Sequence, residues 1–425
     1  MNSSNSATPS QLSSQEGIAT GTLQEFRRDH AWRIVLAAWV GVALGLTALP
    51  FYTLGIFAKP LAQEFGWSRS LIQSGFMFST LGVVLCGWAT GWLIDRFGVR
   101  PVALFSQAGL ALGFVGMASQ DGSPWMWQSC WFVLAVLGVG TTPLTWSRGI
   151  ASWFDKRRGL ALGLALSGTG VTALVAPPLV GAVVSSMGWR TGYLSIALAI
   201  GLFAMPLVWL LFRERSAPAG AAAGAPGAAQ IQGLTLAQAI RTRHFWLLLI
   251  GFALICAAVA GLIPNLVPML TDSGLSLAEA TRYASVLGMN VMLGRLVSGW
   301  LLDRFWAPAV AVALLMPPTV ACVLLAQQQW PGLAVMMIGL AAGAEFDLIA
   351  FLCLRYFGTR NFGQIYAWQW AGFSIATGIG PLAFGLVFDR TGSYHHALWI
   401  AALLLTLGPL LLLALGRYPK HLQAA

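Results

Sequence analysis

Charged residues are scarce in this sequence. Asp, Glu, Lys and Arg make up 9% of its 425 residues, whereas a soluble domain carries about 25%. Hydrophobic residues make up 57%, and the mean hydropathy is +0.73. This composition excludes a large soluble core and predicts an all-α membrane protein that crosses the bilayer many times.

Acidic residues are rarer than basic ones, so the net charge is +10. A basic balance is also found in nucleic-acid-binding proteins, but here Lys and Arg form no dense patch. The charges fall at the ends of apolar runs, a pattern that favours a lipid bilayer over nucleic acid as the partner.

Cysteine is also rare, and no spacing joins it to histidine. Each Cys lies inside an apolar segment without a CxxC pair, so we interpret all five as small hydrophobic residues and expect no metal site: Cys86, Cys130, Cys256, Cys322 and Cys353. The sequence has no Gly-rich nucleotide loop, no nucleophile with a neighbouring base and no soluble sensor domain. It therefore predicts neither an enzyme nor a receptor, and no cofactor.

Twelve apolar stretches are long enough to span a membrane. Residues 31–212 form an N-terminal half and residues 245–416 a C-terminal half, with spans at roughly 33–57, 71–94, 101–119, 125–147, 159–184, 191–212, 245–268, 283–302, 307–326, 331–354, 364–388 and 395–416. The two halves are predicted to be joined by a cytoplasmic linker, 213–244, with a short amphipathic helix at Leu234–Ile240. Residues 1–30, which lack the pattern of a secretory signal, and 417–425 are predicted to be cytoplasmic tails.

The distribution of Lys and Arg gives the orientation. Eighteen of the 24 basic residues lie on the side of the two termini, five lie on the opposite side, and Arg295 lies within a span. Because cytoplasmic loops are enriched in basic residues, both termini are predicted to be cytoplasmic.

The two halves repeat one another. The stretch "GWLIDRFG" at 91–98 matches "GWLLDRFW" at 299–306 with an offset of 208. Three further residues match at an offset of 204, namely Pro177, Gly181 and Gly188 with Pro381, Gly385 and Gly392. Two six-helix halves related in this way are typical of secondary transporters, which bind substrate between the halves.

The stretch "GWLIDRFGVR" resembles the loop motif of the major facilitator superfamily. In this interpretation Gly87 and Gly91 allow close helix packing, and Asp95 approaches the N-terminus of a neighbouring helix. Arg96 and Arg100 hold the loop on the cytoplasmic side, and Gly98 belongs to the same motif. A partial second copy in the other half contains Gly299, Asp303 and Arg304.

Three longer stretches resemble one branch of that superfamily, the bacterial proteins similar to monocarboxylate transporters and oxalate:formate antiporters. They are "FYTLGIFAKPLAQEFGWSRS" (51–70), "WFDKRRGLALGLALSGTG" (153–170) and "GAEFDLIAFLCLRYFGTRNFGQIYAWQWAG" (343–372). The resemblance implies a twelve-helix fold, transport of a small organic anion, often together with a proton, and a place in the inner membrane of a bacterium. We expect the chain to act as a monomer.

Arg295 is the residue that most needs an explanation. It lies eight residues inside the span that ends near Asp303, or about 12 Å into the membrane, where a charge costs about 3 kcal/mol on insertion scales. In one interpretation Arg295 is structural: it pairs with a carboxylate on the 331–354 span and holds the helices together. We favour a second interpretation, in which its guanidinium binds the carboxylate of a substrate, as the resemblance implies.

Two acids on the 331–354 span are candidates for coupling transport to a proton. Glu345 and Asp347 are two residues apart, about 200° around a helix, and so do not share a face. Asp347 lies at about the depth of Arg295 and is the better partner for it. Both acids could also be structural, and the choice between them stays open.

Other mid-membrane residues are candidates for contact with the substrate. Tyr52, Thr142, Gln369 and Trp370 are polar or aromatic, and Trp368 and Thr141 lie next to two of them. Pro264, Asn265 and Pro268 predict a helix break near an outer gate.

The sequence differs from the families that it resembles, and these differences narrow the range of possible substrates. Animal monocarboxylate transporters carry an aspartate where this chain has Val291, and a lysine where it has Tyr52. Oxalate:formate antiporters carry a second cation on the eleventh span, but residues 364–388 include no Lys or Arg. We therefore predict a monocarboxylate taken up with a proton by alternating access, and the alternatives are an anion exchanger or an exporter of drugs or metabolites.

Overall fold

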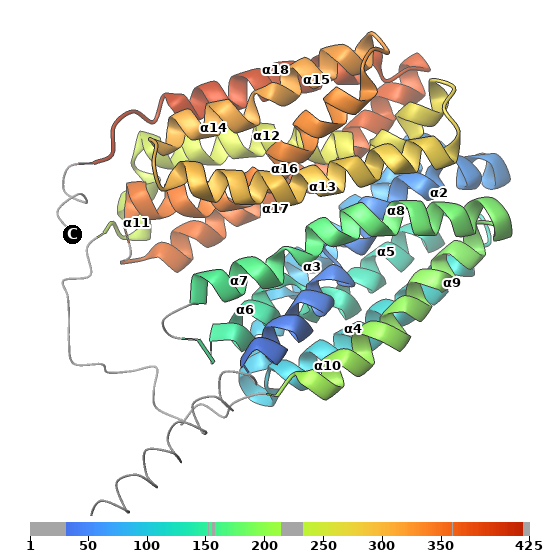
Figure 1. The fold of residues 1–425 in the computed structure, drawn as a ribbon, viewed down its shortest axis with the longest axis horizontal. Coiled ribbons are helices and arrows are strands. Elements are labelled where there is room, and N and C mark those ends of the chain that lie inside the picture. The colour runs from blue at the N-terminus through green and yellow to red at the C-terminus, as the bar shows by residue number, and fades with distance from the viewer. Residues whose placement is uncertain (1–30, 152, 155–157, 214–232, 359, 420–425) are drawn as a thin grey trace, which may run out of the picture.

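The computed structural model describes residues 31–151, 153–154, 158–213, 233–358 and 360–419. The tail 1–30, most of the linker 213–244 and the last six residues lie outside the described residues. Within them the chain is helical apart from short connections, so the all-α membrane fold is confirmed (Figure 1).

The described part of the first half contains five segments long and apolar enough to span a membrane and, before them, two shorter helices that together correspond to the first predicted span. They are Ala31–Ala43 with α2 (Leu49–Phe65), α3 (Arg69–Phe97), α4 (Val99–Ala118), α5 (Pro124–Gly138) with η1 (Val139–Thr141) and α6 (Pro143–Ala151), α7 (Arg158–Leu166) with α8 (Gly168–Met187), and α9 (Trp189–Ala199) with η2 (Ile200–Ala204) and α10 (Met205–Leu211).

The second half contains six spans, preceded by a short helix. They are α12 (Arg243–Asp272), α13 (Leu277–Leu302), α14 (Ala307–Leu315) with α15 (Pro317–Ala326), α16 (Pro331–Phe357), α17 (Phe362–Thr391) and α18 (His395–Leu413). The short helix predicted at Leu234–Ile240 is present as α11 (Leu236–Ile240), and a capping box between Thr235 and Gln238 starts it.

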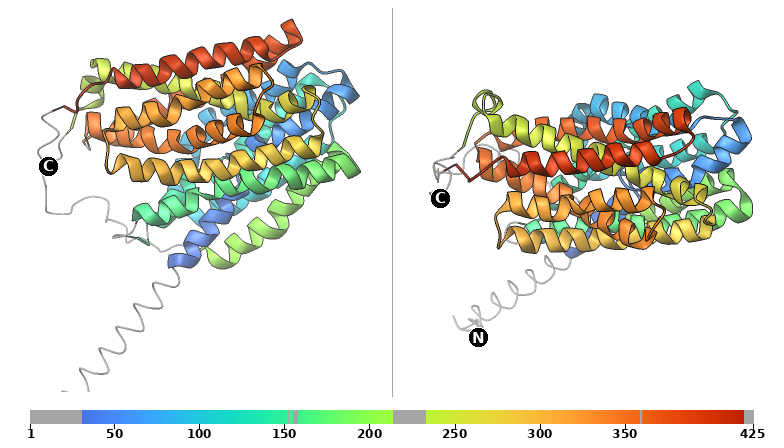
Figure 2. Two further views of the ribbon diagram at one scale, coloured as in Figure 1. Left: turned by 45° about the horizontal axis from the view of Figure 1, so that its top comes forward. Right: turned by 90° about the horizontal axis from the view of Figure 1, so that it is seen from above.

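The helices form two bundles that lie side by side (Figures 1 and 2). The bundles meet chiefly through α2 with α12, α3 with α17, and α8 with α13, and α2 also contacts α13. We call the end where α3 and α13 begin and where α8, α12 and α17 end the closed end. The opposite end, near Ala31, Arg213, Gly233 and Tyr418, is called the terminal end.

The two bundles approach each other most closely toward the closed end. A Cβ added to Gly385 of α17 would lie 2.7 Å from the Cα of Ser70 on α3, and one added to Gly181 of α8 would lie 2.8 Å from the Thr281 side chain on α13. At the terminal ends of these spans a Cβ would meet no atom within 4 Å, at Gly87, Gly91, Gly163, Gly299 and Gly363. The structure is therefore packed at the closed end and open at the terminal end.

This state contradicts one expectation from the sequence. Gly87 and Gly91 do not allow close helix packing here, because nothing lies within 4 Å of an added Cβ at either position. The part of α3 that carries them is at the open, terminal end, where α3 is not in tight contact with the other half.

The predicted break at Pro264 and Pro268 is also wrong. Both prolines lie inside α12, which runs without interruption to Asp272. Pro268 has no N–H to donate to the Pro264 carbonyl, and Gly55 of α2 packs directly against that oxygen. The neighbouring Asn265 donates its side-chain amide to the Gly261 carbonyl, 2.8 Å away, which keeps this polar group bonded within the helix.

The breaks that do occur lie in other spans. The first span is interrupted between Ala43 and Leu49, where the Leu46 N–H donates to the Thr141 hydroxyl at the junction of α5 and α6 (2.9 Å). The fifth span is interrupted at Ser167, between α7 and α8. In a membrane each break exposes backbone groups that must find partners inside the protein.

Two glycines on α13 allow a direct test of the helix packing. An alanine Cβ at Gly294 would overlap the Leu340 carbonyl oxygen of α16, whereas one at Gly299 would meet nothing. We expect Gly294→Ala to lower the melting temperature, because overpacking costs about 1–3 kcal/mol. Gly299→Ala should leave it unchanged or raise it, since alanine favours a helix by about 1 kcal/mol. Tryptophan fluorescence of the detergent-purified protein measures both, and equal melting temperatures would contradict this packing.

Candidate functional site

Arg295 lies on α13 and contacts the other half of the molecule. Its Nη1 donates to the carbonyl oxygen of Leu166, 2.8 Å away in the N-terminal half. Its Nε lies 3.9 Å from Oδ2 of Asp347 on α16 and is buried without a hydrogen-bond partner. The guanidinium also lies 5.9 Å from the ring centre of Phe346, a cation–π distance.

The Leu166 carbonyl is available because the fifth span breaks just after it. The Gly170 N–H, which would bond to Leu166 in a continuous helix, instead donates to the Ser167 carbonyl. The freed Leu166 oxygen accepts the Thr169 hydroxyl at 3.0 Å as well as Arg295. The break thus presents a backbone acceptor to Arg295 on α13.

The two acids of α16 face different neighbours, as their spacing predicts. Asp347 lies beside Arg295 and accepts from the Ser298 hydroxyl at 3.2 Å, and its side chain is 36% exposed. Glu345 is buried, and its one hydrogen bond is from the Cys256 thiol of α12, at 3.8 Å. Asp347 is therefore the ion-pair partner of Arg295, while Glu345 is held only by a weak donor.

Tyr52 brings the first span into the same region. It lies on α2, and its hydroxyl is close enough to interact electrostatically with both Arg295 and Glu345. The structure thus gathers Tyr52, Arg295, Glu345 and Asp347 from α2, α13 and α16, the first of them from the opposite half.

Aromatic rings extend this cluster along α17. Trp370 stacks on Phe373 with ring centres 4.9 Å apart, and both rings contact Phe346, at 5.6 and 5.0 Å. Tyr366 continues the row toward the terminal end, 5.9 Å from Trp370. The Arg295 guanidinium therefore lies at one end of an aromatic surface, which we call the aromatic row: Phe346, Phe373, Trp370 and Tyr366.

Three other candidates from the sequence lie apart from Arg295. Gln369 points into the contact between α17 and α12, where its amide donates to the Phe245 carbonyl at 3.2 Å. Trp368 is 54% exposed on the outside of α17. Thr142 is buried at the end of η1, where its N–H closes the turn on Val139, and no described hydrogen bond or ion pair joins it to Arg295.

The loop motif lies at the terminal end and is held within its own half. Asp95 pairs with Arg148 of α6, and Arg148 also donates to the Gly91 carbonyl at 3.3 Å. Arg100 donates to the Trp209 carbonyl, Arg96 lies over Trp92, and Gly98 adopts φ 90° where α4 begins. In the second copy, Asp303 ends α13 next to Gly299, and Arg304 lies 4.1 Å from the ring of Trp300. Among the residues that the structure describes, no hydrogen bond joins Asp95 to the N-terminus of a neighbouring helix.

Sequence reasoning missed several partners of this site. The Leu166 carbonyl has no sequence signal, because only the broken helix exposes it. Ser298 has one, since it is three residues after Arg295 and so on the same face of α13. Phe346 lies between the two acids, and its place over Arg295 follows from the packing of α16 against α13.

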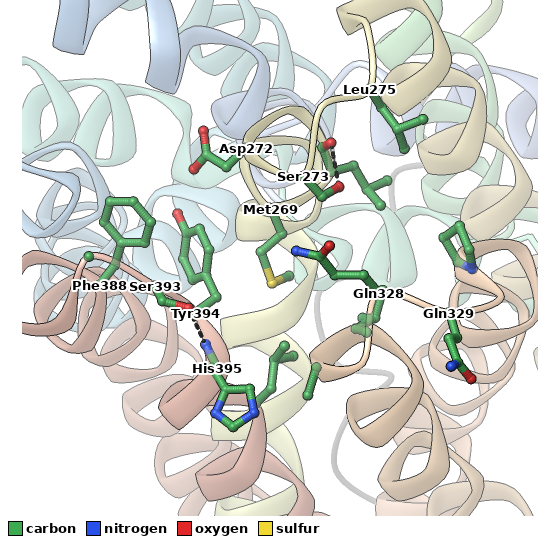
Figure 3. Close-up of a pocket in the computed structure, with 16 residues that line it drawn as sticks. Met269, Asp272, Ser273, Leu275, Gln328, Gln329, Phe388, Ser393, Tyr394 and His395 are labelled. Atoms are coloured by element: carbon green, nitrogen blue, oxygen red, sulfur yellow. Dashed lines mark hydrogen bonds between the residues drawn. The ribbon is translucent and has the colours of Figure 1, made fainter.

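A pocket with both polar and apolar walls lies elsewhere, at the closed end of the C-terminal half. It has a volume of about 530 Å³ and lies between the ends of α12 and α17 and the loop before α16, with Asp272, Phe388 and Tyr394 at one edge (Figure 3). Among the described residues no group of three His, Cys, Asp or Glu side chains could hold a metal ion.

Comparisons with known proteins agree with the architecture. Residues 40–371 match the family model for the Major Facilitator Superfamily. The human protein named monocarboxylate transporter 11 is 27% identical over 92% of this chain and 84% of its own length. The oxalate:formate antiporter of Oxalobacter formigenes is 24% identical over 58% of this chain and 56% of its own length.

A solved structure shows the same fold. A bacterial homolog of the human lysosomal transporter Spinster, in an inward-facing and occupied conformation, is similar with a TM-score of 0.68 at 16% identity. The similarity covers 92% of this chain and 97% of that one.

A double-mutant cycle tests the pairing of Arg295 with Asp347. Arg295→Gln and Asp347→Asn should each lower the free energy of unfolding, and the double variant should lose less than their sum. Because both side chains are partly exposed, we expect a coupling of about 1 kcal/mol. The measurement is chemical unfolding in detergent. Arg295→Gln combined with Asp303→Asn is the control, and its two losses in free energy of unfolding should be additive. If the losses from Arg295→Gln and Asp347→Asn are also additive, the two side chains do not interact.

Proposed function

This chain belongs to the major facilitator superfamily, and from that premise we propose that it imports a monocarboxylate together with a proton. Members of this superfamily are transporters and not enzymes, so the chain is a multi-pass membrane transporter of a small molecule. In the proposal the two halves rock about a central site, and Arg295 binds the carboxylate of the substrate.

The contacts of Arg295 carry this proposal. Its guanidinium meets a neutral carbonyl on one side and a carboxylate 3.9 Å away on the other, and its buried Nε has no hydrogen-bond partner. A planar fork of N–H donors binds a carboxylate with two parallel hydrogen bonds. An anionic substrate can satisfy the free donor and replace Leu166 as the acceptor for Nη1.

Two further observations support a small carboxylate as the substrate, and the second favours one with a single negative charge. The names of the two relatives, monocarboxylate transporter and oxalate:formate antiporter, refer to small carboxylates. Helix α17, which carries three of the four rings of the aromatic row, has no Lys or Arg between Gln364 and Phe388 that could bind a second carboxylate. The aromatic row beside Arg295 favours an acid with a flat apolar group, which would lie against Phe346 and Trp370.

Glu345 is the better candidate for the proton. Asp347 is stabilised as a carboxylate by Arg295 and Ser298. Glu345 is buried with only a thiol as donor, so it is less costly to bury as the neutral acid than as the charged form. Its electrostatic interaction with Arg295 links its proton to the anchor, since a bound anion changes the charge that Glu345 faces.

The orientation follows from the basic residues. Most of them lie at the terminal end, which by the positive-inside rule faces the cytoplasm. The structure is then open toward the cytoplasm, with both termini on that side, in the inner membrane of a bacterium. No contact in the proposal requires a second copy of the chain.

Uptake into proteoliposomes tests the anchor. We expect Arg295→Ala to lower kcat/KM for a transported monocarboxylate by about 100-fold or more, because the carboxylate loses a buried charged partner. Arg295→Lys should fall between that variant and the wild type, since lysine keeps the charge but not the fork. Arg282→Ala, an exposed arginine on the same helix, is the control. Full uptake by Arg295→Ala would exclude the anchor.

A second uptake experiment tests the proton. With an inward proton gradient, wild-type vesicles should accumulate a labelled acid from a panel that runs from lactate to benzoate. Glu345→Gln should lose the accumulation driven by the gradient but retain exchange with vesicles preloaded with the same acid, whereas Asp347→Asn should weaken substrate binding. If wild type shows only exchange, the protein is an anion exchanger, and if it shows neither, export of another substrate is favoured.

A further inference from the structure

Three charged residues join the two halves at the closed end, and nothing in the sequence pattern pointed to them. They are Arg69 at the start of α3, Asp272 at the end of α12 and Asp389 near the end of α17. We propose that these residues form a gate, which keeps the closed end shut in the state described here and must open for the site to face the other side. The inference rests on the alternating access of the proposed function, but not on its substrate or its proton.

Asp389 binds the first backbone groups of α3 across the two halves. Its Oδ1 accepts from the Arg69 N–H and its Oδ2 from the Ser70 N–H, each at 2.8 Å. The next free N–H of the helix, that of Leu71, donates to the Ser68 hydroxyl. A helix N-terminus carries partial positive charge and leaves its first N–H groups without partners. The Asp389 carboxylate, from the opposite half, therefore supplies the hydrogen-bond acceptors and the negative charge that the N-terminus of α3 lacks.

The side chain of Arg69 makes the second connection. Its Nη2 lies 3.1 and 3.0 Å from the two carboxylate oxygens of Asp272, and its guanidinium lies 5.3 Å from the ring centre of Phe388. Only 10% of the Arg69 side chain is exposed. Arg69 therefore meets the C-terminal half with both its backbone and its side chain.

A buried polar contact lies directly beneath the gate. The amide of Gln73, one helical turn below Arg69, donates to Oδ1 of Asn265 at 2.9 Å, and the Tyr394 hydroxyl donates to the same oxygen at 3.3 Å. All three side chains are buried. The Gln73 bond crosses from α3 to α12 and must break when the gate opens, whereas the Tyr394 bond lies within the C-terminal half and holds Asn265 in place.

The surroundings allow the gate to open without leaving a charge in lipid. Asp272 and Phe388 lie at the same edge of the 530 Å³ closed-end pocket, which is open to solvent (Figure 3). Asp272 is 28% exposed while paired, and Asp389 is an exposed residue. When the halves separate, both carboxylates can be hydrated in place, which keeps the cost of breaking their bonds low.

A second carboxylate at the same end provides a matched control. Glu64 of α2 also accepts two hydrogen bonds, from the Trp189 indole and the Arg190 guanidinium of α9. Glu64, Trp189 and Arg190 all belong to the N-terminal half. Glu64 therefore resembles Asp389 in charge, depth and bonding, but its bonds do not cross between the halves.

The experiment measures the separation of the halves without any substrate. Spin labels at Ser186→Cys in the N-terminal half and Gln329→Cys in the C-terminal half report the width of the closed end, in a variant whose five native cysteines are replaced by alanine. Both label positions are exposed. Pulsed electron resonance in lipid nanodiscs then gives the populations with a short and a long distance.

We expect Asp389→Ala to raise the ratio of long to short distances about fivefold or more, as the loss of a helix cap would. Asp272→Asn should shift it in the same direction, and Glu64→Ala by less than twofold. Equal shifts for Asp389→Ala and Glu64→Ala, or no shift for both gate variants, would overturn the proposal. Because Asp272→Asn keeps the shape of its side chain, it gives a readout even if Asp389→Ala folds poorly. Full uptake by Arg295→Ala would exclude the anchor but leave these distance populations unaffected, so the two proposals fail separately.

Discussion

Inside a bilayer every polar backbone group has to find its partner within the protein, and this requirement shapes the site around Arg295. The fifth span breaks at Ser167 and frees the Leu166 carbonyl, which the Thr169 hydroxyl and Arg295 then share. The first span breaks before Leu49, and the Leu46 N–H finds the Thr141 hydroxyl. At both of these breaks a side chain of another span thus forms a hydrogen bond with a freed backbone group. Arg295, which is costly to bury, is the donor that the Leu166 carbonyl receives at the break in the fifth span.

The segments that span the membrane could be predicted from the sequence because hydropathy is a property of consecutive residues. The linker helix near Leu236, the repeat around Asp95 and Asp303 and the unusual position of Arg295 could be predicted for the same reason. Contacts between spans could not. Gly87 and Gly91 have no atom within 4 Å of an added Cβ in this state, and the sequence does not specify which end of the bundle is packed.

The acids of α16 show where helical periodicity stops being informative. Their spacing establishes that Glu345 and Asp347 face different sides of the helix, but it does not say what each side meets. The structure places Asp347 against α13 and Glu345 against α12. A charge that is stabilised by an arginine and an acid that meets a thiol have different energetic preferences, although they lie only two residues apart on the same helix.

In this state Arg295 donates to a main-chain oxygen of the other half, and this has a consequence for how the protein can change over evolutionary time. A carbonyl cannot be removed by replacing a side chain, so mutations at Leu166 leave the acceptor in place as long as the helix remains broken there. Tyr366 and Trp370 of the aromatic row do not supply this acceptor, so they can be replaced without removing the hydrogen bond of Arg295. Under the proposed function, in which the aromatic row contacts the substrate, selection can therefore change which compounds bind while the structure around Arg295 is kept.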